Sequence, residues 1–272
     1  MSNASDSYAN PQKRIFANTE ALDEALVQYV EGALLEAVGV RGNASLVVSG
    51  GSTPRGFFKR LADKPLPWQK IEVTLADERW VPVDDPDSNE GQLRALLPEQ
   101  ISDRFLSLRG AGEDALAQAA LLNKRLVNHP HFDVVILGIG TDGHTASLFP
   151  DAPQLSEGLD TSNPNACLVV DPPQAPHQRI SMSLGRLLRS QQVIVHLTGA
   201  QKAEVLAEAW RGNDPYRFPI AEVLHQQRTP VSIFCDHELA IADYVAVGPV
   251  SYTHLRAHET GRNLVCRRLL EK

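Results

Sequence analysis

A histidine and an aspartate stand two residues apart in the glycine-rich segment 138–150 (GIGTDGHTASLFP). An unperturbed histidine ionises at about pH 6.5, so the imidazole of His144 can exchange protons near neutrality, and Asp142 can orient the ring or raise its basicity. A lone histidine is more often structural than catalytic. This one follows an apolar run and neighbours a carboxylate, which favours acid–base catalysis. No second histidine or cysteine stands nearby at ligand spacing, so the segment does not indicate a metal site.

The residues SGGSTP at 49–54 have the composition of an anion-binding turn. Glycines let the backbone approach an anion closely, and the free amides at a helix start attract negative charge. The segment lacks the Gly-Lys-Ser/Thr ending of the P-loop and does not match the Rossmann glycine fingerprint, so no nucleotide is expected. A plain turn remains the alternative, with Pro54 in the first helical turn and Ser52 or Thr53 as its cap. The candidate phosphate ligands are Gly50, Gly51, Ser52 and Thr53.

Charged side chains also follow another apolar run, in the segment 77–80 (DERW). The guanidinium of Arg79 could bind a phosphate or stabilise negative charge that develops during a reaction. Asp77 and Asn89 could face the same cleft. A solvated charge cluster is the alternative for the segment, and a helix cap shared with Ser88 is the alternative for Asn89.

These segments must be positioned by elements that alternate between strand and helix. Apolar runs predict strands over 44–49, 71–76, 132–138, 179–184, 193–198 and 231–235. Helical spacing and caps predict helices over 20–37, 54–61, 89–97, 114–128, 201–210 and 238–244. Alternation of this kind predicts an α/β fold with a mostly parallel sheet and helices on both faces. Loops that begin at Gly50, Asp77 and Gly138 directly follow strands, so these loops should meet at the carboxyl edge of the sheet. The second of them is expected to extend over 77–88.

Bulk composition narrows the function classes. The chain has 272 residues and a net charge of −7, which disfavours a nucleic-acid or membrane-surface binder. An anionic substrate would require the cations to gather in one site. The N-terminus lacks a secretory apolar segment and no run approaches 18 apolar residues, so we expect a cytoplasmic enzyme without a membrane span. The cysteines are too few and scattered for a disulfide framework or zinc knuckle: Cys167, Cys235 and Cys266.

Taken together, the motifs resemble those of the 6-phosphogluconolactonases. SGGSTP at 49–54, DERWVP at 77–82 and GIGTDGHTASLFP at 138–150 carry the resemblance, and RISM at 179–182 and TGAQK at 198–202 follow in order. The resemblance implies one modified Rossmann-like domain over 14–246, without a nucleotide site, related to glucosamine-6-phosphate isomerase/deaminase and ribose-5-phosphate isomerase. It implies hydrolysis of 6-phospho-D-glucono-1,5-lactone with no metal or organic cofactor. We expect a monomer or weak homodimer that binds neither nucleic acid nor a membrane.

The resemblance also assigns roles. His144 would act as general base and then general acid, oriented by Asp142. Arg79 would neutralise either the oxyanion or the phosphate. The 50–53 turn would hold the phosphate together with Lys202, which would otherwise be read as a solvated helix residue. Arg179 is a weaker candidate for the same task.

Two other functions remain open at this point. An amino-sugar-phosphate deaminase or isomerase would share the phosphate turn, but its Asp-Gly-His turn typically continues Ile-Ala-Phe-Asn-Glu-Pro, where this chain has TASLFP at 145–150. A non-catalytic, sugar-phosphate-binding regulator domain would carry a helix-turn-helix segment. The residues before the first expected strand read instead as one acidic helix.

The segment 248–272 differs in character from the rest of the chain. It resembles a translated cloning or assembly scar, so we expect it to contribute neither to the fold nor to activity. His254, His258 and Cys266 within it could suggest a metal site, and we disfavour that interpretation.

Overall fold

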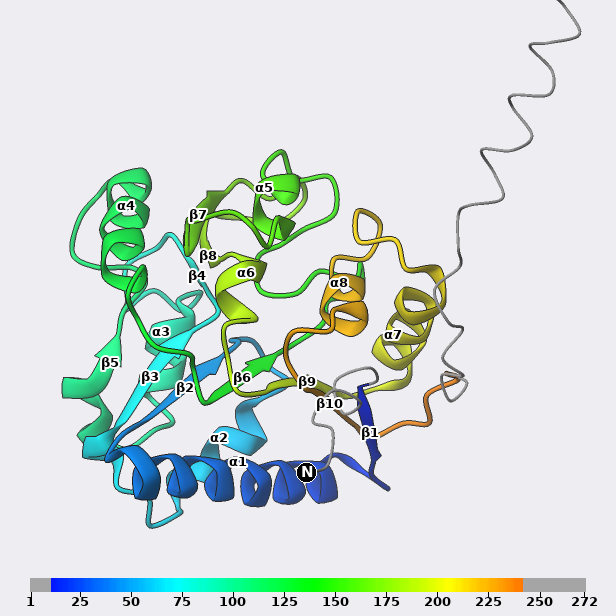
Figure 1. The fold of residues 1–272 in the computed structure, drawn as a ribbon, viewed down its shortest axis with the longest axis horizontal. Coiled ribbons are helices and arrows are strands. Elements are labelled where there is room, and N and C mark those ends of the chain that lie inside the picture. Colours follow the sequence, from blue (N-terminus) through cyan, green and yellow to red (C-terminus); the bar gives the residue numbers. More distant parts are fainter. Residues whose placement is uncertain (1–10, 242–272) are drawn as a thin grey trace, which may run out of the picture. The chain divides into compact units, whose positions relative to one another are not determined.

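Seven parallel strands form the central sheet in the computed structural model, which describes residues 11–241 (Figure 1). The predicted end of the domain at 246 and the segment 248–272 lie outside the described residues. In spatial order the strands are β1 (Gln12–Ile15), β10 (Val231–Cys235), β9 (Val193–Leu197), β6 (Val134–Leu137), β2 (Ala44–Val48), β3 (Ile71–Leu75) and β5 (Phe105–Leu106).

The strand order places a topological switch between β2 and β6. From β2 the chain moves outward to β3 and β5, then returns to the other side of β2 for β6 and continues to β9 and β10. Connections that diverge in this way open a crevice at the carboxyl ends of the two strands. Two hydrogen bonds join the loops there: the amide of Ser49 donates to the carbonyl of Ile136 at 3.0 Å, and the amide of Gly138 donates to the Ser49 hydroxyl at 3.3 Å.

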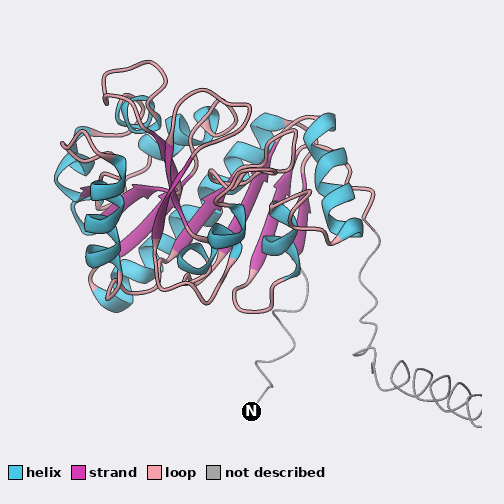
Figure 2. Cartoon of the chain, turned by 90° about the horizontal axis from the view of Figure 1, so that it is seen from above, coloured by secondary structure: helices cyan, strands magenta, loops and turns pink. Residues whose placement is uncertain are grey.

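Helices cover both faces of this sheet (Figure 2). Every residue of β2, β6, β9 and β10 is buried, as expected for strands that are packed on two sides. In Figure 1, α1 and α2 lie on one face, and α6 and α8 lie on the other. The helices are α1 (Thr19–Arg41), α2 (Arg55–Ala62), α3 (Asn89–Arg94), α4 (Ala115–Leu126), α5 (Leu155–Leu159), α6 (Leu184–Leu187), α7 (Ala200–Gly212) and α8 (Ile220–His225).

A second, three-stranded antiparallel sheet has the order β4 (Asp77–Arg79), β8 (Arg179–Met182), β7 (Cys167–Val170). The prediction that 77–88 is a loop was therefore wrong at its start. The charged residues of β4 give no apolar strand pattern, and pairing with β8 from a distant part of the sequence supplies the ladder hydrogen bonds. The register places Arg79 directly opposite Arg179.

Other local features also differ from those predicted. The described chain begins with β1, an edge strand that has no buried residue and so lacks an apolar signal. Neither Ser52 nor Thr53 caps α2: Pro54 occupies the cap position and no side chain bonds the free amides. Residues 238–241 are not helical, and the remainder of the predicted helix lies outside the described residues.

Candidate active site

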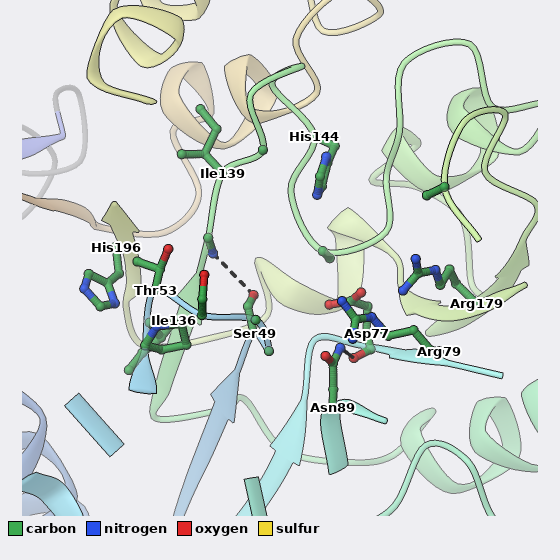
Figure 3. Close-up of a pocket in the computed structure, with 18 of the residues that line it drawn as sticks. Ser49, Thr53, Asp77, Arg79, Asn89, Ile136, Ile139, His144, Arg179 and His196 are labelled. Atoms are coloured by element: carbon green, nitrogen blue, oxygen red, sulfur yellow. Dashed lines mark hydrogen bonds between the residues drawn. The ribbon is translucent and has the colours of Figure 1, made fainter. Parts of the chain in front are cut away.

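A cavity of about 370 Å³ opens at the switch point, beyond the ends of β2 and β6 (Figure 3). Every residue that the sequence nominated for the site lines it, except Asp142. They come from five separate parts of the chain: Gly50, Gly51, Ser52, Thr53, Asp77, Arg79, Asn89, His144, Arg179 and Lys202. The wall also includes His196, which the sequence analysis did not identify.

Asp142 lies behind His144 rather than on the wall. Its Oδ1 atom accepts a hydrogen bond from Nδ1 of the imidazole at 2.6 Å and from the backbone amide of the same histidine at 3.2 Å. Burial raises the pKa of Asp142, but these hydrogen bonds and the charge of the ring outweigh burial and hold the pKa below its usual value. With Nδ1 donating to a carboxylate, Nε2 of the neutral ring is left as the basic atom.

The imidazole is partly open to solvent, with 31% of its surface exposed. Its other side packs on Phe149, whose ring centroid lies 4.4 Å away. The loop is supported from below, where the amide of Ile220 donates to the carbonyl of Gly143 at 3.0 Å. Gly143 has a φ of 81°, which a residue with a side chain adopts only at a cost. The ring is therefore both held in place and accessible.

The turn after β2 and the start of α7 form one end of the cavity. Gly51 has a φ of 93° and Gly199, before α7, has a φ of 90°, and no side chain caps either α2 or α7. Lys202 donates from Nζ to the hydroxyl of Thr53 at 3.0 Å. Burial lowers the pKa of Lys202. The uncapped start of α2 and the Lys202 cation that bonds this turn give this end the chemistry of a phosphate subsite.

The two arginines of the small sheet lie at the other side of the cavity in Figure 3. Arg79 donates to the carbonyl of Asp87 at 2.6 Å, and Arg179 donates to the carbonyl of Pro176 at 2.9 Å. Nε of Arg179 is buried and has no partner among the described residues. Burial, together with the charge of Arg79, lowers the pKa of Arg179, although nearby carboxylates oppose this.

Comparison with known proteins now identifies the family. The family model described as "Glucosamine-6-phosphate isomerases/6-phosphogluconolactonase" matches residues 17–232. The chain belongs to this family. It is 40% identical over 226 residues to a 6-phosphogluconolactonase of Rhizobium meliloti (strain 1021), covering 81% of this chain and 96% of the relative. It is also 40% identical over 220 residues to one of Pseudomonas putida, covering 80% of this chain and 90% of the relative.

Solved structures agree with this family assignment. The crystal structure of a 6-phosphogluconolactonase from Shewanella baltica OS155 superimposes with a TM-score of 0.79 at 40% identity, covering 84% of this chain and 99% of that one. A monomeric glucosamine-6-phosphate deaminase superimposes with a TM-score of 0.71 at 20% identity, which shows a shared fold alone. The predicted fold class is confirmed: a parallel α/β sheet of the glucosamine-6-phosphate isomerase/6-phosphogluconolactonase type.

Asp77 and Asn89 line the cavity of this family member, but much of their bonding is internal. The carboxylate of Asp77 accepts from the hydroxyl of Ser147 at 2.6 Å, which ties β4 to the His144 loop. Asn89 donates from Nδ2 to the carbonyl of Asp77 at 3.1 Å, whereas its Oδ1 is buried without a partner among the described residues. The sequence also allowed Asn89 and Ser88 to share the cap of α3. Ser88 alone is the cap, since its hydroxyl accepts a hydrogen bond from the amide of Gly91 at 3.0 Å.

Glu78 organises this side of the site, a role that its place in the charged segment did not predict. Its carboxylate is buried and accepts from the backbone amides of Arg79 at 2.7 Å, Asn89 at 2.8 Å and Glu90 at 2.6 Å, and from the Ser88 hydroxyl at 3.1 Å. Burial raises the pKa of Glu78, and the backbone hydrogen bonds oppose that rise. One carboxylate thus fixes both the strand that carries Arg79 and the start of α3.

Glu78→Gln should destabilise the fold and disturb the arginine side of the cavity. The amide NH2 would face backbone donors, so at least one buried group would lose its partner, at a cost of roughly 1–3 kcal/mol. We expect a lower midpoint in urea unfolding and a reduced rate with substrate. Glu36→Gln, an exposed position on α1, is the matched control and should leave the midpoint unchanged. A midpoint for Glu78→Gln equal to that of the control would contradict this role.

The structure contains no group of three or more His, Cys, Asp or Glu side chains placed to hold a metal ion within residues 11–241. Over the same residues, no helix is long and apolar enough to cross a membrane.

Proposed function

We propose that this chain is a 6-phosphogluconolactonase, which hydrolyses 6-phospho-D-glucono-1,5-lactone to 6-phospho-D-gluconate in the oxidative pentose phosphate pathway. The observation that carries the proposal is the shared cavity: an imidazole with a free basic nitrogen and an uncapped, cation-bearing turn line the same wall. The relatives of the same name at 40% identity support this reaction.

In the proposed mechanism, Nε2 of His144 removes a proton from water as the water oxygen attacks the lactone carbonyl carbon. A tetrahedral oxyanion forms. It collapses by breaking the bond between C1 and the ring oxygen, and the ring oxygen takes the proton back from the imidazolium. The products are the C5 hydroxyl and a carboxylic acid, which ionises in solution. Asp142 holds the ring and stabilises its charge between the two transfers.

The two cationic ends of the cavity match the two ends of the substrate. Its phosphate lies on C6, which is attached to C5, and its reacting carbonyl is C1, on the other side of the ring oxygen. We assign the phosphate to the turn at 50–53 with Lys202, because the uncapped start of α2 and the Lys202 cation meet at this turn. We assign Arg79 to the oxyanion and to the product carboxylate, and Arg179 assists it from the opposite position of the strand pair.

Lactone freshly generated by glucose-6-phosphate dehydrogenase tests the function. We expect the lactone to disappear faster than in buffer, in proportion to enzyme concentration, after the spontaneous rate is subtracted. Decay at the buffer rate would overturn the proposal. Glucosamine-6-phosphate should release no ammonia, because the turn at 145–150 has Leu148 and Phe149 at the positions where the deaminase motif supplies Asn and Glu. Ammonia release would favour the deaminase alternative instead.

We further propose a cytoplasmic enzyme that works as a monomer or weak homodimer. The proposed mechanism uses only cavity residues of this chain and assigns no role to a residue of a second copy. Activity per chain should therefore stay constant on dilution while light scattering reports the oligomeric state.

A further inference from the structure

A buried histidine–carboxylate pair lies at the phosphate end of the cavity. His196, on β9, is 2% exposed and lies beside Thr53 in Figure 3, and both line the cavity. Asp23, on α1, is 4% exposed. Nε2 of the imidazole lies 3.8 Å from Oδ1 of the carboxylate, and neither atom has a hydrogen-bond partner among the described residues. Buried polar atoms left in this state are costly, so the pair calls for an explanation.

The charges around the pair keep the imidazole neutral. Burial, and then the charge of Lys202 on α7, lowers the pKa of His196 to about 4, and Asp236 beyond β10 opposes the shift. Burial raises the pKa of Asp23 to about 6, which Arg60 on α2 opposes and Asp236 reinforces. The other neighbours do not titrate: Phe57 on α2, at 6.4 Å between ring centroids, and Phe234, the register partner on β10.

We propose that the Asp23–His196 pair belongs to the phosphate subsite and takes up one proton from solvent when the phosphate group of the substrate or product binds. The inference rests on the proposed function, since it needs a phosphate at the 50–53 turn. Its geometric basis is the arrangement of three groups: His196 lines the cavity with the 50–53 turn, and the carboxylate of Asp23 lies 3.8 Å from the imidazole.

A phosphate dianion supplies what the empty site lacks. It offsets the charge of Lys202 on one side of the imidazole, while Asp23 already lies on the other. A protonated His196 then sits between two anions, and Nε2 donates to Oδ1 once the gap of 3.8 Å tightens. The proton belongs to the coupled pair rather than to one residue. No covalent bond to carbon or phosphorus changes in this step.

Isothermal titration of 6-phosphogluconate into the whole chain tests this. Between pH 7 and pH 8 the phosphomonoester is already mostly dianionic, because its second pKa is about 6. Uptake of one proton predicts that affinity falls about tenfold over that pH unit, by linkage. At fixed pH, the binding enthalpy should also change with the ionisation enthalpy of the buffer, in the ratio of about one proton per site.

Variants locate the proton. His196→Gln and Asp23→Asn should each flatten the pH dependence to less than threefold. His144→Gln removes the other cavity imidazole and should leave the tenfold slope intact. Lys202→Arg carries a cation that does not titrate in this range, and should bind with the same slope. If a variant at 196 or 23 fails to fold, the ¹⁵N shifts of the histidine rings in the unaltered chain decide, because one ring should become protonated on product binding.

The possible failures are distinguishable. Binding of 6-phosphogluconate without proton uptake, or uptake that survives in His196→Gln or disappears in His144→Gln, overturns the role of the pair and leaves the proposed function in place. A wild-type chain that binds no 6-phosphogluconate overturns the phosphate subsite itself, and the inference falls with it.

Discussion

His144→Gln should lower kcat for 6-phosphogluconolactone by roughly 10²–10⁴-fold. Glutamine keeps a polar side chain of similar size against Phe149, but it cannot accept a proton from water at neutral pH. Nε2 is the atom that the geometry leaves free, since Nδ1 is engaged by Asp142 at 2.6 Å. The loss should fall on kcat. Binding of 6-phosphogluconate should change little, because the phosphate subsite lies at the 50–53 turn.

The measurement is a stopped-flow assay on lactone generated in situ, with spontaneous hydrolysis subtracted at each pH. Asp142→Asn is the companion variant: it keeps a partner for the ring but removes the charge that stabilises the imidazolium, so it should lose less than the histidine variant. A His144→Gln enzyme with near-wild-type kcat would remove the imidazole from the mechanism. A loss confined to KM would instead make it a binding residue.

The parts of the site that follow strands could be predicted, because strand ends carry a local signal. The runs before 49–54 and 138–150 are apolar and flanked by glycines, so parallel pairing brings the two loops together. The alternative of a turn capped by Ser52 or Thr53 was wrong: both residues have the composition of caps, yet neither caps α2, and Thr53 accepts from Lys202. Local composition cannot show that Lys202, on the distant helix α7, donates a hydrogen bond to the Thr53 hydroxyl.

Buried polar residues were the largest omission. Glu78 and His196 look like ordinary members of a charged cluster and an apolar strand, and Asp23 looks like a solvated residue of an acidic helix. Their importance comes from burial and from partners far away in the sequence, such as the 3.8 Å approach between α1 and β9. No spacing rule reports such an approach, because sheet topology creates it.

The distribution of charge links the fold to the substrate. The chain carries a net charge of −7, yet Arg79, Arg179 and Lys202 line one cavity. They reach it from β4, β8 and α7, three elements that the two sheets bring together. Anionic substrate is thus attracted locally, while the acidic remainder of the surface disfavours other polyanions.

Gly140→Ala should lower kcat by about 10²-fold while the fold survives. A Cβ atom at this position would collide with Nδ1 of His144 and with Oδ1 of Asp142, at the hydrogen bond between them. Neither Gly140 nor Gly138 has a positive φ, so backbone strain is not the cause. The methyl group must displace the imidazole, and a shift of about 1 Å at a catalytic group can cost about that factor.

Gly138→Ala is the matched control in the same loop, because its added Cβ would meet nothing nearer than the Cβ of Ser49 at 4.0 Å. We expect it to lose less than tenfold in kcat and to keep the orientation of the imidazole. Rates from the lactone assay, compared with thermal unfolding of both variants, separate the two effects. Equal losses of kcat in the two enzymes would show that the loop tolerates no side chain at either position. A clash between a Cβ at position 140 and the His144–Asp142 pair would then not explain the loss.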